Sequence, residues 1–407
     1  MKNVKKYTLT LLLGLTAGVI CGLCGTLFSK TVGFVTALRQ SNGWLLWLLP
    51  IGGLLTVLVY KLCKVKNTGT TNVFDCAREN QDLPNGLPVA IFLTTAISHL
   101  FGASAGREGA ALQIGGGVAN ILGKAFKLDK DSKRITVMCG MAALFSAVFG
   151  TPLAACVFVL EAVFSSLSLY AVIPVLISSF SAFAVSRFFG VSPERFELGA
   201  LPKFSLTLVL KTALITAAGI LVAFIFCQSL IRGKTLFKKA VKNEYLRIAL
   251  GGIIIIALTF LVGNRDYNGG GIDVIERVFE GSVKYEAFAL KILFTAICIS
   301  AGYKGGEIIP TLFIGATFGG ALAQLLALPM GFGAAVGMAV LFCAATKCPV
   351  ATVLLCCEML GFSCAPFVIP TVIISFISAR YPGLYSNSMD IIKYTHQKHK
   401  AKKLQTE

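Results

Sequence analysis

The chain has 407 residues, of which 56% are hydrophobic and only 14% are charged. Soluble globular proteins carry about 25% charged residues, so this composition excludes a soluble enzyme and predicts a membrane protein with several crossings. The formal net charge of +18 is compatible with a nucleic-acid partner, but the basic residues lie in short connections between apolar runs, where the positive-inside rule predicts them. We therefore expect the lipid bilayer, and no nucleic acid, as the partner of this charge.

Fourteen apolar segments follow one another along the chain. They lie near residues 7–28, 44–63, 88–103, 110–126, 135–148, 152–170, 172–190, 206–231, 247–263, 285–299, 309–328, 331–345, 349–362 and 366–379. At roughly 20 residues per crossing, the apolar residues suffice for about eleven full spans. Several segments must therefore be short, tilted or re-entrant helices, which lipid tolerates only where their ends pack against protein. We expect an all-α polytopic membrane protein.

The basic connections predict how the chain is oriented. Clusters of Lys and Arg occur at residues 2–6, 61–66, 124–134, 232–247 and 393–403. Positively charged connections favour the cytoplasmic side, so both termini are expected there, with the protein in the plasma membrane. The connections near residues 39–43 and 192–203 carry sparser charge and are expected on the outside.

Four landmarks of the first half recur in the second. Ser104-Ala105-Gly106, Gln113-Ile114-Gly115, Pro152-Leu153-Ala154 and Glu161 return as Ser300-Ala301-Gly302, Phe313-Ile314-Gly315, Pro349-Val350-Ala351 and Glu358. We predict a first membrane repeat at residues 1–200, a second and inverted repeat at 201–395, and a basic cytoplasmic tail at 396–407. Inverted repeats are typical of secondary transporters. Because Glu161 and Glu358 occupy one repeat position, we expect them to cap or pair structurally.

Two charges and an amide interrupt an otherwise apolar stretch at Gly106-Arg107-Glu108-Gly109 and Gln113. Charges inside a membrane segment are costly and usually functional. The glycines allow backbone N–H groups at the next helix start to attract an anion. A carboxylate at Glu108 would compete with that anion until protonation removes its charge, which couples anion movement to proton movement. The alternative is a structural pair between Arg107 and Glu108.

These motifs resemble those of the CLC family of chloride channels and anion/proton exchangers. The resemblance rests on the GREG sequence at 106–109, QIGG at 113–116, Pro152 and Pro349 with their glutamates, and the stretch Pro382-Gly383-Leu384-Tyr385-Ser386. The motifs fall in order over nearly the whole chain. The resemblance implies a homodimer of helical subunits, with a CLC-type inverted repeat of tilted and broken helices and one anion pathway in each subunit.

The same resemblance implies functional residues. Glu108 occupies the position of the gating glutamate, and the loop at 304–310 adds Glu307 beside the expected anion site. We expect these two carboxylates to gate the pathway and couple it to protons. The residues expected to bind the anion are Thr70, Thr71, Asn72, Gly106, Arg107, Gly109, Ile308, Ile309 and Tyr385. Glu307 could instead pair with Lys304, and Tyr385 could be an interfacial tyrosine.

A carboxylate at Glu307 resembles the fluoride/proton antiporter branch of the family, although the threonine of that branch is replaced by Ile309. The position of an internal proton-relay glutamate is Ala162. Fluoride is strongly hydrated, so a site must offer close hydrogen-bond donors such as hydroxyls and amides. We predict exchange of a halide for protons, with fluoride export as the leading prediction. A chloride channel or a chloride/proton antiporter is the alternative.

A remote alternative is an intramembrane serine hydrolase. Gly102-Ala103-Ser104-Ala105-Gly106 matches the G-x-S-x-G pattern, with His99 five residues upstream of Ser104. That pattern belongs on a turn between a strand and a helix, which the apolar helical context does not provide, so no enzymatic activity is expected. The 13 cysteines lie mostly inside apolar segments without ligand spacing, so neither a metal nor a cofactor is expected.

Overall fold

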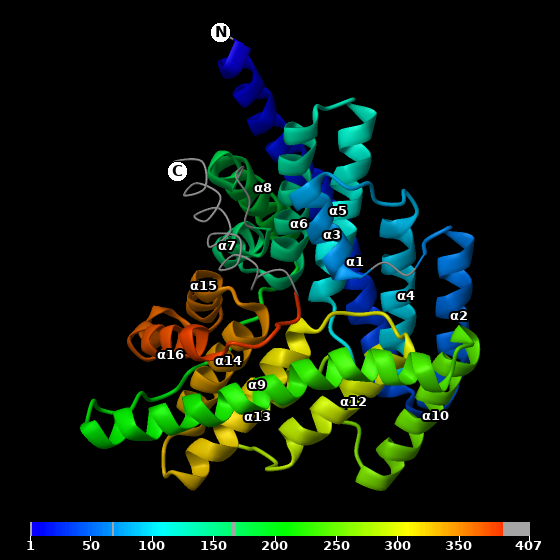
Figure 1. Ribbon diagram of the computed structural model, residues 1–407. Coiled ribbons are helices and arrows are strands. Elements are labelled where there is room, and N and C mark those ends of the chain that lie inside the picture. The colour runs from blue at the N-terminus through cyan, green and yellow to red at the C-terminus, as the bar shows by residue number, and fades with distance from the viewer. Residues whose placement is uncertain (1, 67–68, 164–167, 386–407) are drawn as a thin grey trace, which may run out of the picture.

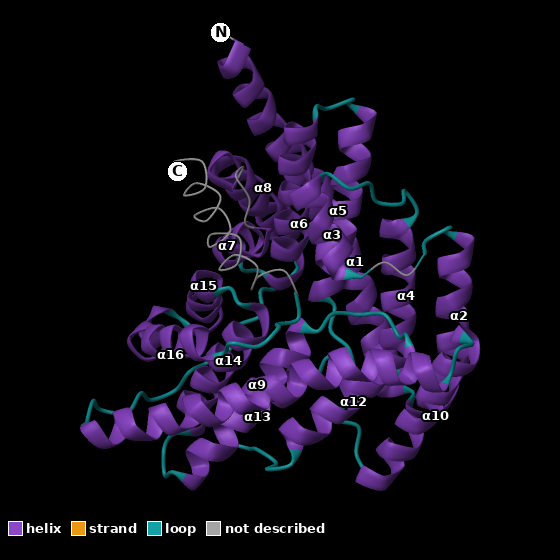
Figure 2. Cartoon of the chain, viewed as in Figure 1, coloured by secondary structure: helices purple, strands orange, loops and turns teal. Residues whose placement is uncertain are grey.

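The protein is described by a computed structural model that covers residues 2–66, 69–163 and 168–385. Within these ranges the regular elements are helices, apart from one isolated β-bridge (Figure 2). The expected all-α architecture is therefore confirmed. The predicted basic tail at 396–407 lies outside the described residues.

The first half of the chain forms helices that are blue to green in Figure 1. They are α1 (Lys2–Ser41), η1 (Gly43–Leu48), α2 (Leu49–Leu62), α3 (Thr70–Glu79), α4 (Leu87–Phe101), α5 (Glu108–Ala125), α6 (Lys130–Phe149), α7 (Pro152–Val163) and α8 (Ser168–Phe188). The second half of the chain forms a further set of helices. It contains α9 (Leu206–Ala240), α10 (Glu244–Val262), α11 (Ile272–Phe279), α12 (Ala287–Ala301), α13 (Ile308–Leu325), α14 (Met330–Thr346), α15 (Pro349–Leu360), η2 (Phe362–Cys364) and α16 (Ala365–Ser378).

The helices differ widely in length. Among the described residues, seven helical stretches are long and apolar enough to cross a membrane. They are Thr8–Ser41, Gly43–Leu62, Lys130–Phe149, Leu169–Phe188, Leu206–Ala240, Glu244–Val262 and Ile308–Leu325. The other apolar helices have only 10–17 residues, which confirms the expected mixture of full-length and short helices.

The centre of the molecule consists of α5 packed on α6 and α13 packed on α14. Every residue of α14 from Gly331 to Thr346 is buried, as expected for a helix that is apolar on all sides. Glycines allow the close approach: a Cβ on Gly115 would lie 2.1 Å from the carbonyl oxygen of Gly140. These two pairs hold the starts of α5 and α13 in the interior of the protein.

The starts of α5 and α13 meet through an antiparallel β-bridge between Gly106 and Gly306. The N–H of Gly106 donates to the carbonyl of Gly306 at 2.8 Å, and the reverse bond measures 2.6 Å. Each glycine lies two residues before its helix. Gly106 and Gly306 therefore occupy equivalent places in the two halves. The pairing of Gly106 with Gly302 expected from the sequence is wrong, because Gly302 follows α12 just as Gly102 follows α4.

Glu161 and Glu358 form a second reciprocal contact. The Glu161 carboxylate, near the end of α7, accepts the N–H groups of Val350 and Ala351 at the start of α15. Glu358, near the end of α15, accepts those of Leu153 and Ala154 at the start of α7. The expected capping role of both glutamates is confirmed.

Two short helices and several boundaries differ from the expectation. The segments α3 and α11 were not expected to be helical, because each is short and carries too many polar residues to form an apolar run. The first helix extends to Ser41, well beyond the apolar segment expected at 7–28. Polar residues follow that segment, but they belong to the same helix. The segment expected at 152–170 begins as α7 at Pro152, and the described residues follow it to Val163.

Candidate functional site

Two cavities lie on opposite sides of the starts of α5 and α13. The Tyr385 vestibule, of about 280 Å³, is lined by Thr70, Thr71, Gln113, Glu307 and Tyr385 among others. The Glu108 vestibule, of about 220 Å³, includes Gly106, Arg107, Glu108 and Ile309. The segment that contains Gly305 and Glu307 lines the first cavity, whereas Ile309 lines the second. A narrow part of the protein, built around the Gly106–Gly306 bridge, therefore separates two polar openings.

Glu108 is the first residue of α5 and is completely buried. Its Oε2 accepts the backbone N–H of Arg107 at 3.0 Å, and a Cβ on Gly106 would lie only 2.8 Å from that oxygen. The absence of a side chain at Gly106 therefore leaves room for the carboxylate. Its other oxygen, Oε1, has no hydrogen-bond partner among the described residues, so one lone-pair face remains available at a helix start.

Arg107 lies beside this carboxylate but has further partners. Its Nε is 3.6 Å from Glu108 Oε1, which is an ion pair without a hydrogen bond. The terminal nitrogens of its guanidinium donate to Ser29 and Glu194. Arg107 is thus held mainly by α1 and by the connection between α8 and α9. Sequence reasoning missed Glu194, because that connection carries no recognisable motif.

The hydroxyl and amide groups expected near the anion lie in different places. Gln113 donates from Nε2 to the Thr70 hydroxyl at 3.0 Å, so the hydroxyl hydrogen of Thr70 can point to an anion in the Tyr385 vestibule. Thr71 also lines this cavity. The Asn72 side chain instead accepts the Gly69 N–H at 2.9 Å and is absent from the lining. Its place is a cap on α3.

Glu307 immediately precedes α13, and its carboxylate is 14% exposed. It lies 3.7 Å from the ammonium of Lys234. Lys304, the partner considered from the sequence, instead has its ammonium 4.3 Å from the ring centroid of Tyr60. The 304–307 pairing is therefore wrong. Lys234 belongs to the basic cluster that the sequence suggested only as a membrane anchor.

The apolar members of the predicted set are buried. Tyr385 is 2% exposed, and its ring packs against Phe74 and Phe158 at centroid distances of 5.0 and 6.0 Å. This placement excludes an interfacial tyrosine. Ile309 lines the Glu108 vestibule, whereas Ile308 is buried in the core and lines neither vestibule.

Gly109 completes the predicted set. It lies in the first turn of α5, where a Cβ would come within 2.8 Å of the Gly306 Cα. Its role in the structure is the close contact between the two helix starts.

Ser104 and His99 are not arranged as a nucleophile and its base. The Ser104 hydroxyl is hydrogen-bonded to Thr295 at 3.0 Å, and the Nε2 of His99 has no hydrogen-bond partner among the described residues. No group of three or more His, Cys, Asp or Glu residues in the described ranges could hold a metal ion.

Comparisons with known proteins agree with this architecture. The sequence model of the family described as voltage gated chloride channel matches residues 68–380. A chloride/fluoride channel protein of Pseudomonas syringae pv. tomato is 32% identical over 386 residues, which cover 92% of this chain and 84% of that protein. An H(+)/Cl(-) exchange transporter ClcA of Vibrio cholerae is 27% identical over 437 residues, and the match covers 97% of this chain and 91% of that protein.

A solved structure gives the same result for the fold. The crystal structure of a CLC-type fluoride/proton antiporter superposes with a TM-score of 0.89 at 31% sequence identity, and the match covers 93% of this chain and 97% of that one. Together with the sequence matches over most of the chain, this likeness gives the identity of the fold. The chain is a multi-pass membrane protein that belongs to the CLC family of anion channels and anion/proton antiporters.

Proposed function

We propose that this protein exports fluoride from the cell in exchange for protons. The observation that carries the proposal is the Glu108 carboxylate, which is fully buried at the start of α5 and borders one of two vestibules. Its Oε1 has no hydrogen-bond partner among the described residues. A helix start stabilises negative charge, so either this carboxylate or a free anion can occupy the place, but not both.

The exchange follows from that competition. An anion entering the Tyr385 vestibule is attracted by Lys234, Lys238 and Arg247, because cavities lined by one sign of charge concentrate counter-ions. While Glu108 is ionised, its charge repels the anion and its side chain blocks the helix start. A proton arriving through the Glu108 vestibule removes that charge, and the anion then takes the vacated position. Release of the proton returns the carboxylate and expels the anion.

Two features favour fluoride as the anion. Glu307 borders the Tyr385 vestibule and adds a second carboxylate to the pathway. The vestibule also offers the hydroxyls of Thr70 and Thr71, which can replace water around a strongly hydrated ion. A chloride/fluoride channel protein of Pseudomonas and a CLC-type fluoride/proton antiporter are 32% and 31% identical to this chain.

The proposal includes a plasma-membrane homodimer with both termini in the cytoplasm. Two of the basic connections meet in the structure, since Lys61, Lys64 and Arg247 line one cavity. Within a third connection, at 124–134, Lys124 and Lys133 both pair with Asp82. The meeting of the connections at 61–66 and 232–247 supports a single positively charged face, which the positive-inside rule assigns to the cytoplasm. The dimer is an inference from the family.

The test is ion flux in liposomes that contain the purified protein. An imposed proton gradient should drive fluoride uphill, and an imposed fluoride gradient should drive protons. Glu108→Gln keeps the size of the side chain but cannot titrate, so fluoride movement should lose its coupling to protons. The matched control is Glu280→Gln, which should retain coupled exchange because Glu280 is an exposed glutamate directly after α11.

Running fluoride and chloride side by side decides the ion. Proton-driven flux of chloride alone would replace fluoride export with chloride/proton exchange. Passive flux of either anion that ignores the proton gradient in the unaltered protein would show a channel, and would refute the coupling assigned to Glu108.

A further inference from the structure

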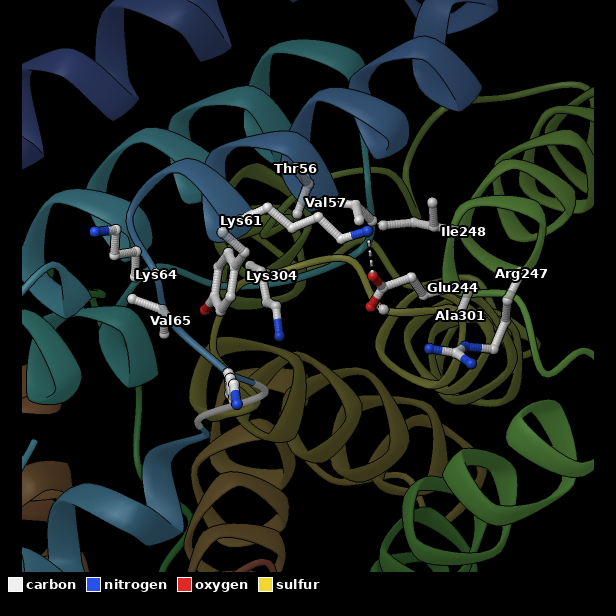
Figure 3. Close-up of a pocket in the computed structure, with 13 residues that line it drawn as sticks. Thr56, Val57, Lys61, Lys64, Val65, Glu244, Arg247, Ile248, Ala301 and Lys304 are labelled. Atoms are coloured by element: carbon white, nitrogen blue, oxygen red, sulfur yellow. Dashed lines mark ion pairs between the residues drawn. The ribbon is translucent and has the colours of Figure 1, made fainter. Parts of the chain in front are cut away.

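A third cavity lies beside the Tyr385 vestibule (Figure 3). Its volume is about 640 Å³. It is enclosed by the end of α2, the connection that follows it, the start of α10 and the segment after α12. The charged residues of its lining are Lys61, Lys64, Lys66, Arg247, Lys304 and Glu244.

The positive charge of this cavity is largely unbalanced. Glu244 pairs with Lys61 at 3.3 Å, the contact marked by the dashed line in Figure 3. The other four basic side chains form no ion pair with a carboxylate in the described part of the chain. Like charges gathered in a partly enclosed space repel one another. An anion that contacts several of these basic side chains at once would reduce that repulsion.

The donors suit a group with several oxygens. In Figure 3 the Arg247 guanidinium and the Lys304 ammonium extend toward the same open space. Tyr60 also lines the cavity, and its ring centroid lies 4.3 Å from the Lys304 ammonium. A guanidinium fork and neighbouring ammonium groups match a phosphate group, whose oxygens accept several hydrogen bonds.

Size separates this ligand from the transported ion. A cavity of about 640 Å³ falls in the range of sites for organic ligands, roughly 300–1,000 Å³, and is far larger than a halide needs. Val57, Val65 and Ile248 supply an apolar side. We propose that this cavity binds a phosphate-bearing anion, supplied either by the headgroup of an anionic phospholipid or by a soluble phosphate compound.

Binding there would regulate transport, an effect that rests on the proposed function. The cavity shares Arg247, Gly302 and Lys304 with the Tyr385 vestibule. A bound phosphate neutralises two of the charges that attract the transported anion into that vestibule. Lys304 also lies three residues before Glu307 in the same connection. Occupation of the cavity therefore slows entry of the transported anion.

Binding is measured first, without any transport. Inorganic pyrophosphate is added to the detergent-purified protein, and the midpoint of thermal denaturation is followed, since a ligand of the folded state raises it. Retained phosphatidylglycerol is counted in parallel by native mass spectrometry. The variant Lys64→Gln/Lys66→Gln changes residues that line this cavity but neither vestibule. Lys127→Gln/Lys130→Gln, both exposed near the α5–α6 turn, removes the same charge elsewhere.

We expect the 64/66 variant to lose most of the pyrophosphate shift, most of the retained lipid, or both, while the 127/130 variant behaves as the unaltered protein. A loss confined to pyrophosphate identifies a soluble ligand, and a loss confined to lipid identifies a headgroup. Equal binding by the two variants, or no binding by the unaltered protein, would overturn the proposal.

Transport is then compared in phosphatidylcholine vesicles with and without phosphatidylglycerol or pyrophosphate. The ligand should slow anion flux severalfold in the unaltered protein and much less in the 64/66 variant. An unchanged rate with ligand bound would overturn the regulatory part. Because the binding measurements use neither fluoride nor a proton gradient, absence of fluoride exchange would refute the proposed function and leave the cavity assignment intact.

Discussion

The contact between Gly106 and Gly306 makes a sharp prediction for the substitution Gly306→Ala. The added methyl group would lie 2.4 Å from the Gly109 nitrogen and 2.9 Å from its Cα. Both are backbone atoms, so no side-chain rotation relieves the clash. Restoring an ordinary contact of 3.4 Å requires the start of α5 and the start of α13 to separate by about 1 Å. Overpacking of this kind costs about 1–3 kcal/mol of stability.

The effect on transport should be larger than the effect on stability. Glu108 is the residue before Gly109, so the same displacement moves its carboxylate relative to Arg107. A misplacement of about 1 Å in a working site can reduce its rate roughly 100-fold. Proton-driven fluoride flux and the denaturation midpoint are measured together. The control is Gly33→Ala, which adds the same methyl group to the lining of the Glu108 vestibule but without a clash, because a Cβ there meets nothing within 4 Å. Unchanged coupled flux in Gly306→Ala would refute the reasoning.

Three further substitutions test other contacts. Glu161→Ala leaves two N–H groups at the start of α15 without their acceptor and should cost about 1–2 kcal/mol in denaturant titrations; Glu161→Gln should recover part of it. Lys291→Met removes a buried ammonium that donates to the Gly269 carbonyl at 2.7 Å, and should lower stability by about 1.5–3 kcal/mol. Gln113→Leu removes the 3.0 Å bond to Thr70 and should raise the fluoride KM severalfold while proton coupling persists, as parallel fluxes would show.

The apolar segments and the repeat could be predicted because both leave a direct trace in the sequence. A helix buried on all sides, such as α14, is a long apolar run, and the recurring prolines and glutamates mark equivalent helices. The short helices α3 and α11 were missed because packing, and not an apolar run, makes them helical. The division of the chain at residue 200 stays a prediction; the described helices α8 and α9 end and begin on either side of it.

The vestibules show where sequence reasoning stops. Glu108 could be singled out because a carboxylate in an apolar stretch is costly. Glu194 and Lys234 could not, because each acts through a contact with a residue more than 70 positions away. Lys291 is fully buried and holds the connection beside the Glu108 vestibule, yet a single lysine in an apolar run gives no partner. A charge in an apolar stretch shows that a residue is unusual, but only the fold shows which partner that residue contacts.

The reciprocal contacts of Glu161 and Glu358 have a consequence for biosynthesis. Leu153 precedes Glu358 by 205 residues, so the ribosome must produce almost the entire second half before the first turn of α7 acquires its acceptor. Until then, backbone donors in a lipid environment lack a partner, which is unfavourable. The start of α7 therefore lacks these hydrogen bonds until residue 358 has been synthesised, and a translation product truncated before residue 358 would lack them permanently.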